Sequence, residues 1–225
     1  LLVTGPANAV TNPPPVATIQ GTNIVVLLTD DQVFDSLHCL GNSLISTPNL
    51  DRICTSGMIF RNAHIMGGWA HAVCLPSRTM VMTGRTLWRV PGLSGNSFPA
   101  NITNKTIPAI FGNAGFDTIR SGKSRNSYTA ANIRFGQYFY HDDRDDVASS
   151  RFVNDVLNWI TNREIAGKTN PMFIYLGFDH PHDPRHAPQS YLDKFHASAP
   201  NPDPNTPLAL LPPLPPNYLP KHPFD

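Results

Sequence analysis

Runs of apolar residues mark the first elements that the chain is expected to form. Residues 23–29 (NIVVLLT) and 171–178 (PMFIYLGF) are short apolar runs rich in β-branched and aromatic residues, a pattern typical of strands buried on both faces. A further strand is expected at residues 116–120. Each of these segments is too short to be a membrane span.

Four segments between and around these strands carry helix signals. Residues 48–53 begin with a proline, residues 74–83 stop before Gly84, and residues 107–113 are followed by Gly115. Residues 147–163 place apolar side chains at helical spacing. Strands that alternate with helices predict an α/β fold, in which helices sandwich a mostly parallel sheet.

Composition narrows the class of protein without revealing its chemistry. The chain has 225 residues, with 17 basic and 16 acidic side chains, so it offers no basic face for a nucleic acid. Three cysteines, an odd number, exclude a disulfide framework that uses every thiol. We expect Cys39 and Cys54 to be buried free thiols, with a bridge between them as the alternative.

Both ends of the chain look cut. Residues 1–19 resemble the remnant of a signal peptide, with Ala7-Asn8-Ala9 as the cleavage site, followed by a proline-rich linker. This interpretation predicts a periplasmic or secreted protein, and an ordinary frayed terminus is the alternative. Residues 200–225 hold ten prolines and no helix or strand pattern. We therefore expect residues 20–225 to be the N-terminal part of a larger domain, incomplete at the C-terminus.

Polar groups follow the predicted strands, where α/β proteins place their sites. Asp30-Asp31 follow the first strand, Gly122-Lys123 the second and His180 and His182 the last. Two adjacent carboxylates are suitable oxygen ligands for a hard divalent cation. The alternative is a loop in which one aspartate caps a helix and the other faces water.

The most informative stretch is Cys74-Leu75-Pro76-Ser77-Arg78, which Thr83-Gly84-Arg85 follows. By itself, Cys74 is either a small buried apolar residue or a thiol activated at a helix N-terminus, and Arg78 could hold an anion beside it. The pattern C-x-P-S-R with a following Thr-Gly resembles the signature of type I sulfatases, which belong to the alkaline-phosphatase-like superfamily. In that family the cysteine is oxidised to formylglycine, an aldehyde.

Other segments extend this resemblance over roughly residues 20–225. NIVVLLTDDQ resembles the family's first strand and metal-binding aspartates, and TPNLD at residues 47–51 matches a family segment. Gly122-Lys123 stands where the family has a substrate lysine, and His180-Pro181-His182 resembles its sulfate-contacting motif. The tail LPPNYLPKHPFD is similar to a segment of a bacterial subgroup of sulfatases.

The resemblance implies hydrolysis of a sulfate monoester by the hydrated aldehyde of residue 74. It assigns Asp30, Asp31 and residue 74 to a divalent cation, Ca²⁺ or alternatively Mg²⁺. The positive groups expected to bind the sulfate and support catalysis are Arg78, Lys123 and His182, with His180 and Arg125 as further substrate contacts. The implied partners are a sulfated carbohydrate or an aryl or alkyl sulfate, and the enzyme that generates formylglycine.

Two departures from the family pattern matter. The family usually has G-K-x-H, whereas this chain reads Gly122-Lys123-Ser124-Arg125-Asn126. We therefore expect the role of the histidine in G-K-x-H to be taken by Arg125 or Asn126, or by a histidine elsewhere in the chain, which could be His64, His71 or His180. The remaining metal ligands and a second lysine are expected beyond residue 225, so we expect these 225 residues alone to be nearly inactive.

Two other functions fit the same residues. A phosphonate or phosphodiester hydrolase of the superfamily uses formylglycine and similar aspartates. A truncated sulfatase fragment would bind anions without turning them over.

Overall fold

The structure is a computed structural model that describes residues 21–68, 73–90, 103–141, 145, 147–184 and 186–195. The predicted leader at residues 1–19, the proline-rich residues 200–225 and His71 lie outside these ranges. The α-helices and strands are β1 (Ile24–Leu28), α1 (Pro48–Ser56), α2 (Cys74–Thr83), α3 (Ile107–Asn113), β2 (Asp117–Gly122), α4 (Thr129–Asn132), β3 (Gln137–Tyr138), α5 (Ala148–Ile165), β4 (Met172–Gly177) and α6 (Gln189–Leu192).

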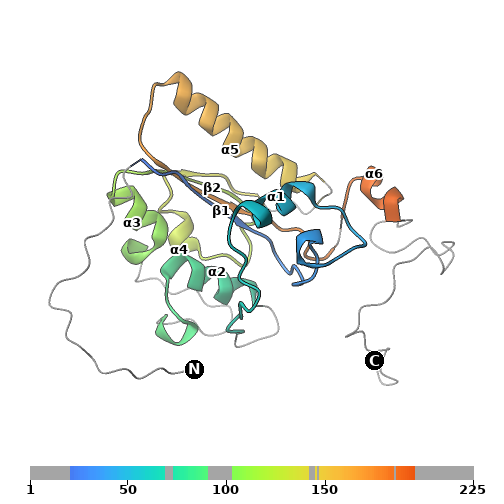
Figure 1. Cartoon of the computed structure of the whole chain (residues 1–225). Coiled ribbons are helices and arrows are strands. Elements are labelled where there is room, and N and C mark those ends of the chain that lie inside the picture. The colour runs from blue at the N-terminus through green and yellow to red at the C-terminus, as the bar shows by residue number, and fades with distance from the viewer. Residues whose placement is uncertain are drawn as a thin grey trace.

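The described strands form one parallel sheet in the order β1-β4-β2-β3. Helices cover both faces: α2, α3 and α4 lie on one side of it and α5 on the other (Figure 1). The predicted α/β class with a parallel sheet between helices is confirmed. None of the described helices has the length and apolar character needed to cross a membrane.

The central strand β4 supplies both halves of the core. Phe173 and Tyr175 pack with residues of α2, α3 and α4, whereas Ile174 and Leu176 pack against α5. Because successive side chains of a strand point to opposite faces, a continuous apolar run such as this one needs a helical layer on each side. The predicted burial of this strand is confirmed.

The prediction that β1 is buried on both faces is wrong. Val25 is 54% exposed and Leu27 is 49% exposed, whereas Ile24, Val26 and Leu28 pack against the core under α2. The reason is the position of β1, which pairs only with β4 in the described part of the sheet. The helix on the second face, α5, packs on β2 and β4.

The four predicted helices are present, and their ends follow the expected chemistry. Pro48 stands in the first turn of α1. Gly84 ends α2 in the left-handed conformation at φ 61°, with its N–H donating to the Met80 carbonyl. The short strand β3 was not predicted, because two residues give no periodic signal.

The expectation of free thiols at positions 39 and 54 is wrong, since Cys39 and Cys54 form a disulfide. Cys39 lies in a short 3₁₀ helix, His38–Leu40, which the bond ties to α1. The Cys39 N–H also donates to Asp51 Oδ1 at 2.9 Å. A spacing of 15 residues in the sequence does not reveal the pair; the turn that folds this loop back onto α1 does.

Candidate active site

The site lies where three parallel strands end side by side. Leu28 of β1 pairs with Gly177 of β4, and Gly177 pairs with Gly122 of β2. The polar groups that follow this row of residues are Asp30, Asp179 and Lys123. Strand register therefore brings together two carboxylates and an ammonium group that are far apart in the sequence.

Gly122 is required at the end of β2. Its φ is 121°, and a Cβ atom at this position would collide with the backbone of Gly177. Only glycine combines this backbone conformation with such close approach of two strands. The next residue is held by a hydrogen bond from the Lys123 N–H to the Gly177 carbonyl, at 2.7 Å.

Asp30 is the buried centre of the site, at 7% exposure. Its Oδ1 accepts a hydrogen bond from the Cys74 thiol, with the sulfur at 3.4 Å. Its Oδ2 accepts from Lys123 Nζ and from Arg78 Nη2, the latter at 3.4 Å. One carboxylate thus connects the cysteine with both cations.

The first turns of α2 carry two of these groups. Cys74 begins the helix, and Arg78 is one turn further along on the same face. Arg78 Nη2 also donates to the Phe178 carbonyl at 3.0 Å, and Nη1 donates to the Tyr175 hydroxyl at 3.3 Å. A Cβ atom on Gly177 would come within 2.7 Å of Arg78 Nη1, so this glycine leaves room for the guanidinium.

Lys123 is buried at 1% exposure and has several polar neighbours. Besides Asp30, its Nζ lies 3.3 Å from Asp179 Oδ1 and 4.0 Å from the Cys74 sulfur. A buried ammonium requires such compensation, because desolvation of an unpaired charge costs several kcal/mol. This burial shows that Lys123 is not a solvated surface lysine.

The pocket over these groups has a volume of about 420 Å³. It is lined by Leu28, Thr29, Asp30, Asp31, Gln32, Ile65, Val73, Cys74, Ser77, Arg78 and His182. The ligand atoms of Asp30, Cys74 and His182 lie within 4.8 Å of one another, so the three could share a metal ion. Asp31 is at the rim, in a left-handed turn with φ 55°, and is exposed.

The donor set fits a hard divalent cation in part. Asp30 and Asp31 supply the carboxylate oxygens that Ca²⁺ and Mg²⁺ prefer, and both line the pocket. A Ca²⁺ ion takes about six to eight oxygen ligands. The described residues of the pocket therefore provide part of such a coordination shell.

Burial and charge shift two pKa values in this site. Burial by itself raises the pKa of Asp30, but the hydrogen bond from Lys123 and the charge of Arg78 outweigh it and leave the pKa below its usual value. Burial, together with the neighbouring Asp30 carboxylate, raises the pKa of the Cys74 thiol. The cysteine is therefore a protonated thiol near neutral pH, which is unlike an activated nucleophile.

Besides the buried Lys123, two predicted substrate contacts, His180 and Arg125, are not among the residues that line the described pocket. His180 Nδ1 is 2.8 Å from the Ser149 hydroxyl on α5, and its carbonyl accepts a hydrogen bond from the Asp30 N–H. Arg125 is exposed in the turn before α4. The roles predicted for both side chains remain untested.

Two other candidates for the role of the family's histidine are exposed in the structure. Asn126 is exposed in the same turn as Arg125, and His64 is exposed in the loop after α1. The assignment among them and His180 stays a prediction.

Sequence reasoning missed Asp179, which is 4% exposed and pairs with Lys123. The available signal was its position directly after the apolar run of β4, which matches the position of Asp30 after β1.

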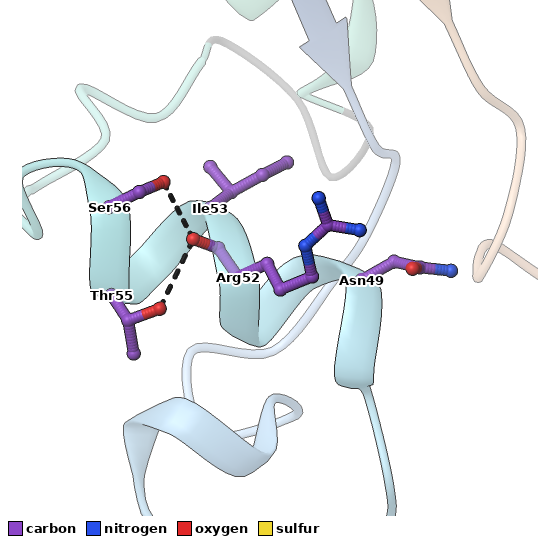
Figure 2. A pocket seen from close by; sticks show the side chains of 5 residues that line it. All are labelled: Asn49, Arg52, Ile53, Thr55 and Ser56. Carbon is purple, nitrogen blue, oxygen red and sulfur yellow. Dashed lines mark hydrogen bonds between the residues drawn. The ribbon is translucent and has the colours of Figure 1, made fainter.

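Two further pockets are lined by residues outside this site. One, of about 400 Å³, lies on α1 and is lined by Asn49, Arg52, Ile53, Thr55 and Ser56 (Figure 2). The hydroxyls of Thr55 and Ser56 both donate to the Arg52 carbonyl of their own helix. The other, of about 580 Å³, lies after α2 and is lined by Gly84, Arg85, Thr86 and Arg89.

Comparison with known proteins identifies the family. The family model described as Sulfatase matches residues 22–210. The chain belongs to the sulfatase family. Its match with an N-acetylglucosamine-6-O-sulfatase of Bacteroides thetaiotaomicron is 34% identical and covers 45% of this chain and 17% of that protein. Its match with an arylsulfatase of Clostridium perfringens is 27% identical and covers 77% of the chain and 46% of that enzyme.

Solved structures show the same fold. A protein in complex with its substrate, D-glucosamine-2-N,6-O-disulfate, has a TM-score of 0.62 at 23% identity, over 73% of this sulfatase chain and 35% of that one. A phosphonate monoester hydrolase of Agrobacterium radiobacter has a TM-score of 0.62 at 15% identity, and the match covers 81% of this chain and 45% of that one. The sulfatase chain spans less than half the length of each of these relatives.

Proposed function

We propose that this chain carries the nucleophile and the sulfate-binding cations of a sulfuric ester hydrolase that cleaves a sulfate monoester. The observation that supports this most strongly is the cluster of contacts that joins Cys74, Asp30, Arg78 and Lys123. A sulfate group needs several positive partners because its charge is spread over its oxygens. Arg78 and Lys123 are two such partners beside position 74.

Each residue has a distinct proposed role. Cys74 is converted by a maturation enzyme to formylglycine, whose hydrated form supplies a hydroxyl for attack on sulfur. Arg78 and Lys123 neutralise the sulfate oxygens and stabilise the charge that develops in the transition state. His182, partly exposed at the pocket, protonates the leaving oxygen. His180 and Arg125 remain proposed contacts to the rest of the substrate.

The proposed cation is Ca²⁺, with Mg²⁺ as the alternative. Asp30 and Asp31 would hold it together with residue 74, and when bound it lowers the pKa of an oxygen ligand. In the structure Lys123 and Arg78 balance the charge of Asp30. A buried carboxylate without a cation or a basic partner would be strongly destabilising.

The proposed substrate class is a sulfated carbohydrate. Support comes from a relative named N-acetylglucosamine-6-O-sulfatase and from a similar structure bound to a glucosamine disulfate. Aryl and alkyl sulfates remain alternatives. A phosphonate or phosphodiester substrate is the second candidate, favoured by the fold shared with the phosphonate monoester hydrolase.

We further propose that the protein works in the periplasm or outside the cell. The Cys39–Cys54 disulfide supports this, because disulfides persist in oxidising compartments and are rare in the cytosol. It also leaves Cys74 as the free thiol among the three cysteines, ready for the maturation enzyme.

The test uses the full-length protein, produced together with a formylglycine-generating enzyme. Mass spectrometry of the peptide that contains Cys74 should show the sulfur replaced by oxygen together with the loss of two hydrogens, which distinguishes the aldehyde from a serine. Hydrolysis of 4-nitrophenyl sulfate and of N-acetylglucosamine 6-sulfate is compared with hydrolysis of bis(4-nitrophenyl) phosphate. We expect Cys74→Ala to lower the rate by more than about a thousandfold, because it removes the nucleophile.

Faster turnover of the phosphodiester than of both sulfate esters would favour the second candidate. An unmodified Cys74 thiol, with no turnover of any ester, would leave only the interpretation as an anion-binding fragment.

A further inference from the structure

Arg120 is a buried charge that the proposed mechanism does not use. It lies in the middle of β2 and is 0% exposed. Its Nη2 donates to the Lys123 carbonyl. Among the described residues, its Nε and Nη1 have no hydrogen-bond partner. The strand thus places an arginine immediately behind the lysine of the site.

Aromatic rings replace the usual carboxylate partner around this guanidinium. Its central carbon lies 5.1 Å from the centre of the Tyr138 ring and 5.8 Å from that of Tyr175. Cation–π contacts of this kind are attractive, by up to about 2 kcal/mol when the cation is desolvated. Burial lowers the pKa of Arg120, and the nearby Tyr175, Tyr138 and Asp179 act in the opposite direction.

Stability alone gives no reason for a charge at this position. Desolvation of a guanidinium costs several kcal/mol, and an apolar side chain of similar volume would avoid that cost. The contacts that Arg120 makes therefore point to a role in holding its neighbours.

We propose that Arg120 and Asp179 are positioning residues that fix Lys123 from both ends. Arg120 holds the Lys123 carbonyl from within the sheet. Asp179 holds the ammonium group, 3.3 Å away, beside the Cys74 sulfur. The ammonium group of Lys123 lies near two carboxylates, those of Asp30 and Asp179. Lys123 therefore keeps Asp179 as a partner when Asp30 binds a different group.

Arg120 is also linked, through Tyr175, to Arg78, the second cation of the site. The Tyr175 ring that lies against Arg120 carries the hydroxyl that accepts a hydrogen bond from Arg78 Nη1. The separation of the two sulfate-binding cations is thus set by Arg120 through a backbone carbonyl on one side and a tyrosine on the other. This inference rests on the proposed function of Lys123 and Arg78 as sulfate ligands.

The test is a set of double-mutant cycles on the full-length protein. Arg120→Met, Arg120→Lys and Asp179→Asn are each made with Lys123 intact and in a Lys123→Met background. Affinity for inorganic sulfate is measured by calorimetry, and kcat and KM are measured with 4-nitrophenyl sulfate. The matched controls are Arg163→Met and Asp117→Asn, which remove another buried arginine that lies over an aromatic ring and its carboxylate partner.

With Lys123 intact, we expect Arg120→Met and Asp179→Asn each to weaken sulfate binding on the order of tenfold, a coupling typical of residues in contact. In the Lys123→Met background the same changes should have less than about a twofold effect. Arg120→Lys keeps the charge and should restore part of the affinity. The controls should lower stability and leave sulfate affinity unchanged in both backgrounds.

Equal effects in the two backgrounds would overturn the inference, and so would a failure of the unsubstituted protein to bind sulfate. If Arg120→Met does not fold, Arg120→Lys and Asp179→Asn decide the question by the same comparison. Coupled effects on sulfate binding without turnover of any ester would reject the proposed function and leave the positioning role intact. Ester turnover with equal effects in the two backgrounds would support the proposed function and reject the positioning role.

Discussion

At the scale of single residues, Asp30 determines the character of position 74. One oxygen of its carboxylate accepts a hydrogen bond from the Cys74 thiol, and the other accepts hydrogen bonds from Arg78 and Lys123. A thiol that donates to a carboxylate is held in its protonated form. We therefore expect the Cys74 thiol to be less prone to oxidation, which proceeds through the thiolate.

The reactivity of Cys74 tests this arrangement. The protein is produced without a formylglycine-generating enzyme and is studied in the presence of a chelator. The substitution Asp30→Asn removes the negative charge that helps to raise the pKa of the Cys74 thiol. The thiolate fraction at pH 7 then increases, and alkylation by iodoacetamide should become roughly threefold to tenfold faster. Because Cys39 and Cys54 form a disulfide, the label reports Cys74.

The matched control is Asp117→Asn, which makes the same chemical change at the opposite end of β2. It should leave the alkylation rate unaltered. A rate that stays constant or decreases in Asp30→Asn would contradict the proposed influence of the carboxylate.

The sequence predicted the residues of the site unevenly. Cys74, Arg78 and Lys123 belong to short motifs and could be named from the chain alone. Asp179 follows an apolar run as Asp30 does, but its burial and that of Arg120 could not be predicted, because an aspartate in a loop and an arginine in a strand are normally solvated. Only the pairing of β2 with β4 buries both of them beside Lys123.

At the scale of elements, an ion pair joins the end of α5 to the start of β2. Arg163 Nε donates to Asp117 Oδ2 at 2.8 Å, and Asn170 donates to the other oxygen. Burial by itself raises the pKa of Asp117, but the hydrogen bonds from Arg163 and Asn170 together outweigh it and leave the pKa below its usual value. A lowered carboxyl pKa contributes stability above the pKa of the unfolded chain and loses it as the pH falls.

Urea unfolding of Asp117→Asn tests this contact. Near pH 7 we expect the free energy of unfolding to fall by about 1.5–3 kcal/mol, the range for a hydrogen bond to a charged group. Below about pH 4 the wild-type carboxylate becomes protonated, so the difference between the two proteins should shrink.

Asp145→Asn is the control, since Asp145 pairs with Arg151 on the surface. Its cost should stay below about 1 kcal/mol. A loss for Asp117→Asn that is equally large at pH 3 and pH 7 would show that charge plays no part in the contact.

The elements themselves were largely predictable, because their signals are local. Pro48 and Gly84 mark a helix start and a helix stop, and the apolar spacing of residues 147–163 identifies α5. The exposure of one face of β1 was not predictable. It depends on which helix covers which strand, and that is decided by contacts distant in sequence.

At the scale of the whole molecule, the described surface carries an uncovered apolar face on β1. Val25 and Leu27 are about half exposed, on a strand that pairs on one side in the described sheet. An apolar edge strand of this kind favours association with another chain. We expect the 225-residue chain, purified alone, to self-associate through this face.

Analytical ultracentrifugation tests this expectation. The double substitution Val25→Thr and Leu27→Thr keeps residues that favour strands, removes apolar surface and should shift the chain toward monomer. Leu157→Gln removes a similarly exposed leucine from α5 and should not change the association. A monomeric unsubstituted chain, or equal effects of both changes, would contradict the role of β1.

The sequence by itself determined the class of fold, the positions of most helices and strands, and the family signature around Cys74. These follow from periodicity, capping residues and a short motif, all of which are local. The tertiary structure alone decided that Asp30, Asp179 and Lys123 meet, that Arg120 is buried behind them and that Cys39 bonds to Cys54. The physical reason is that strand order and register bring these groups together, and both are set by long-range packing.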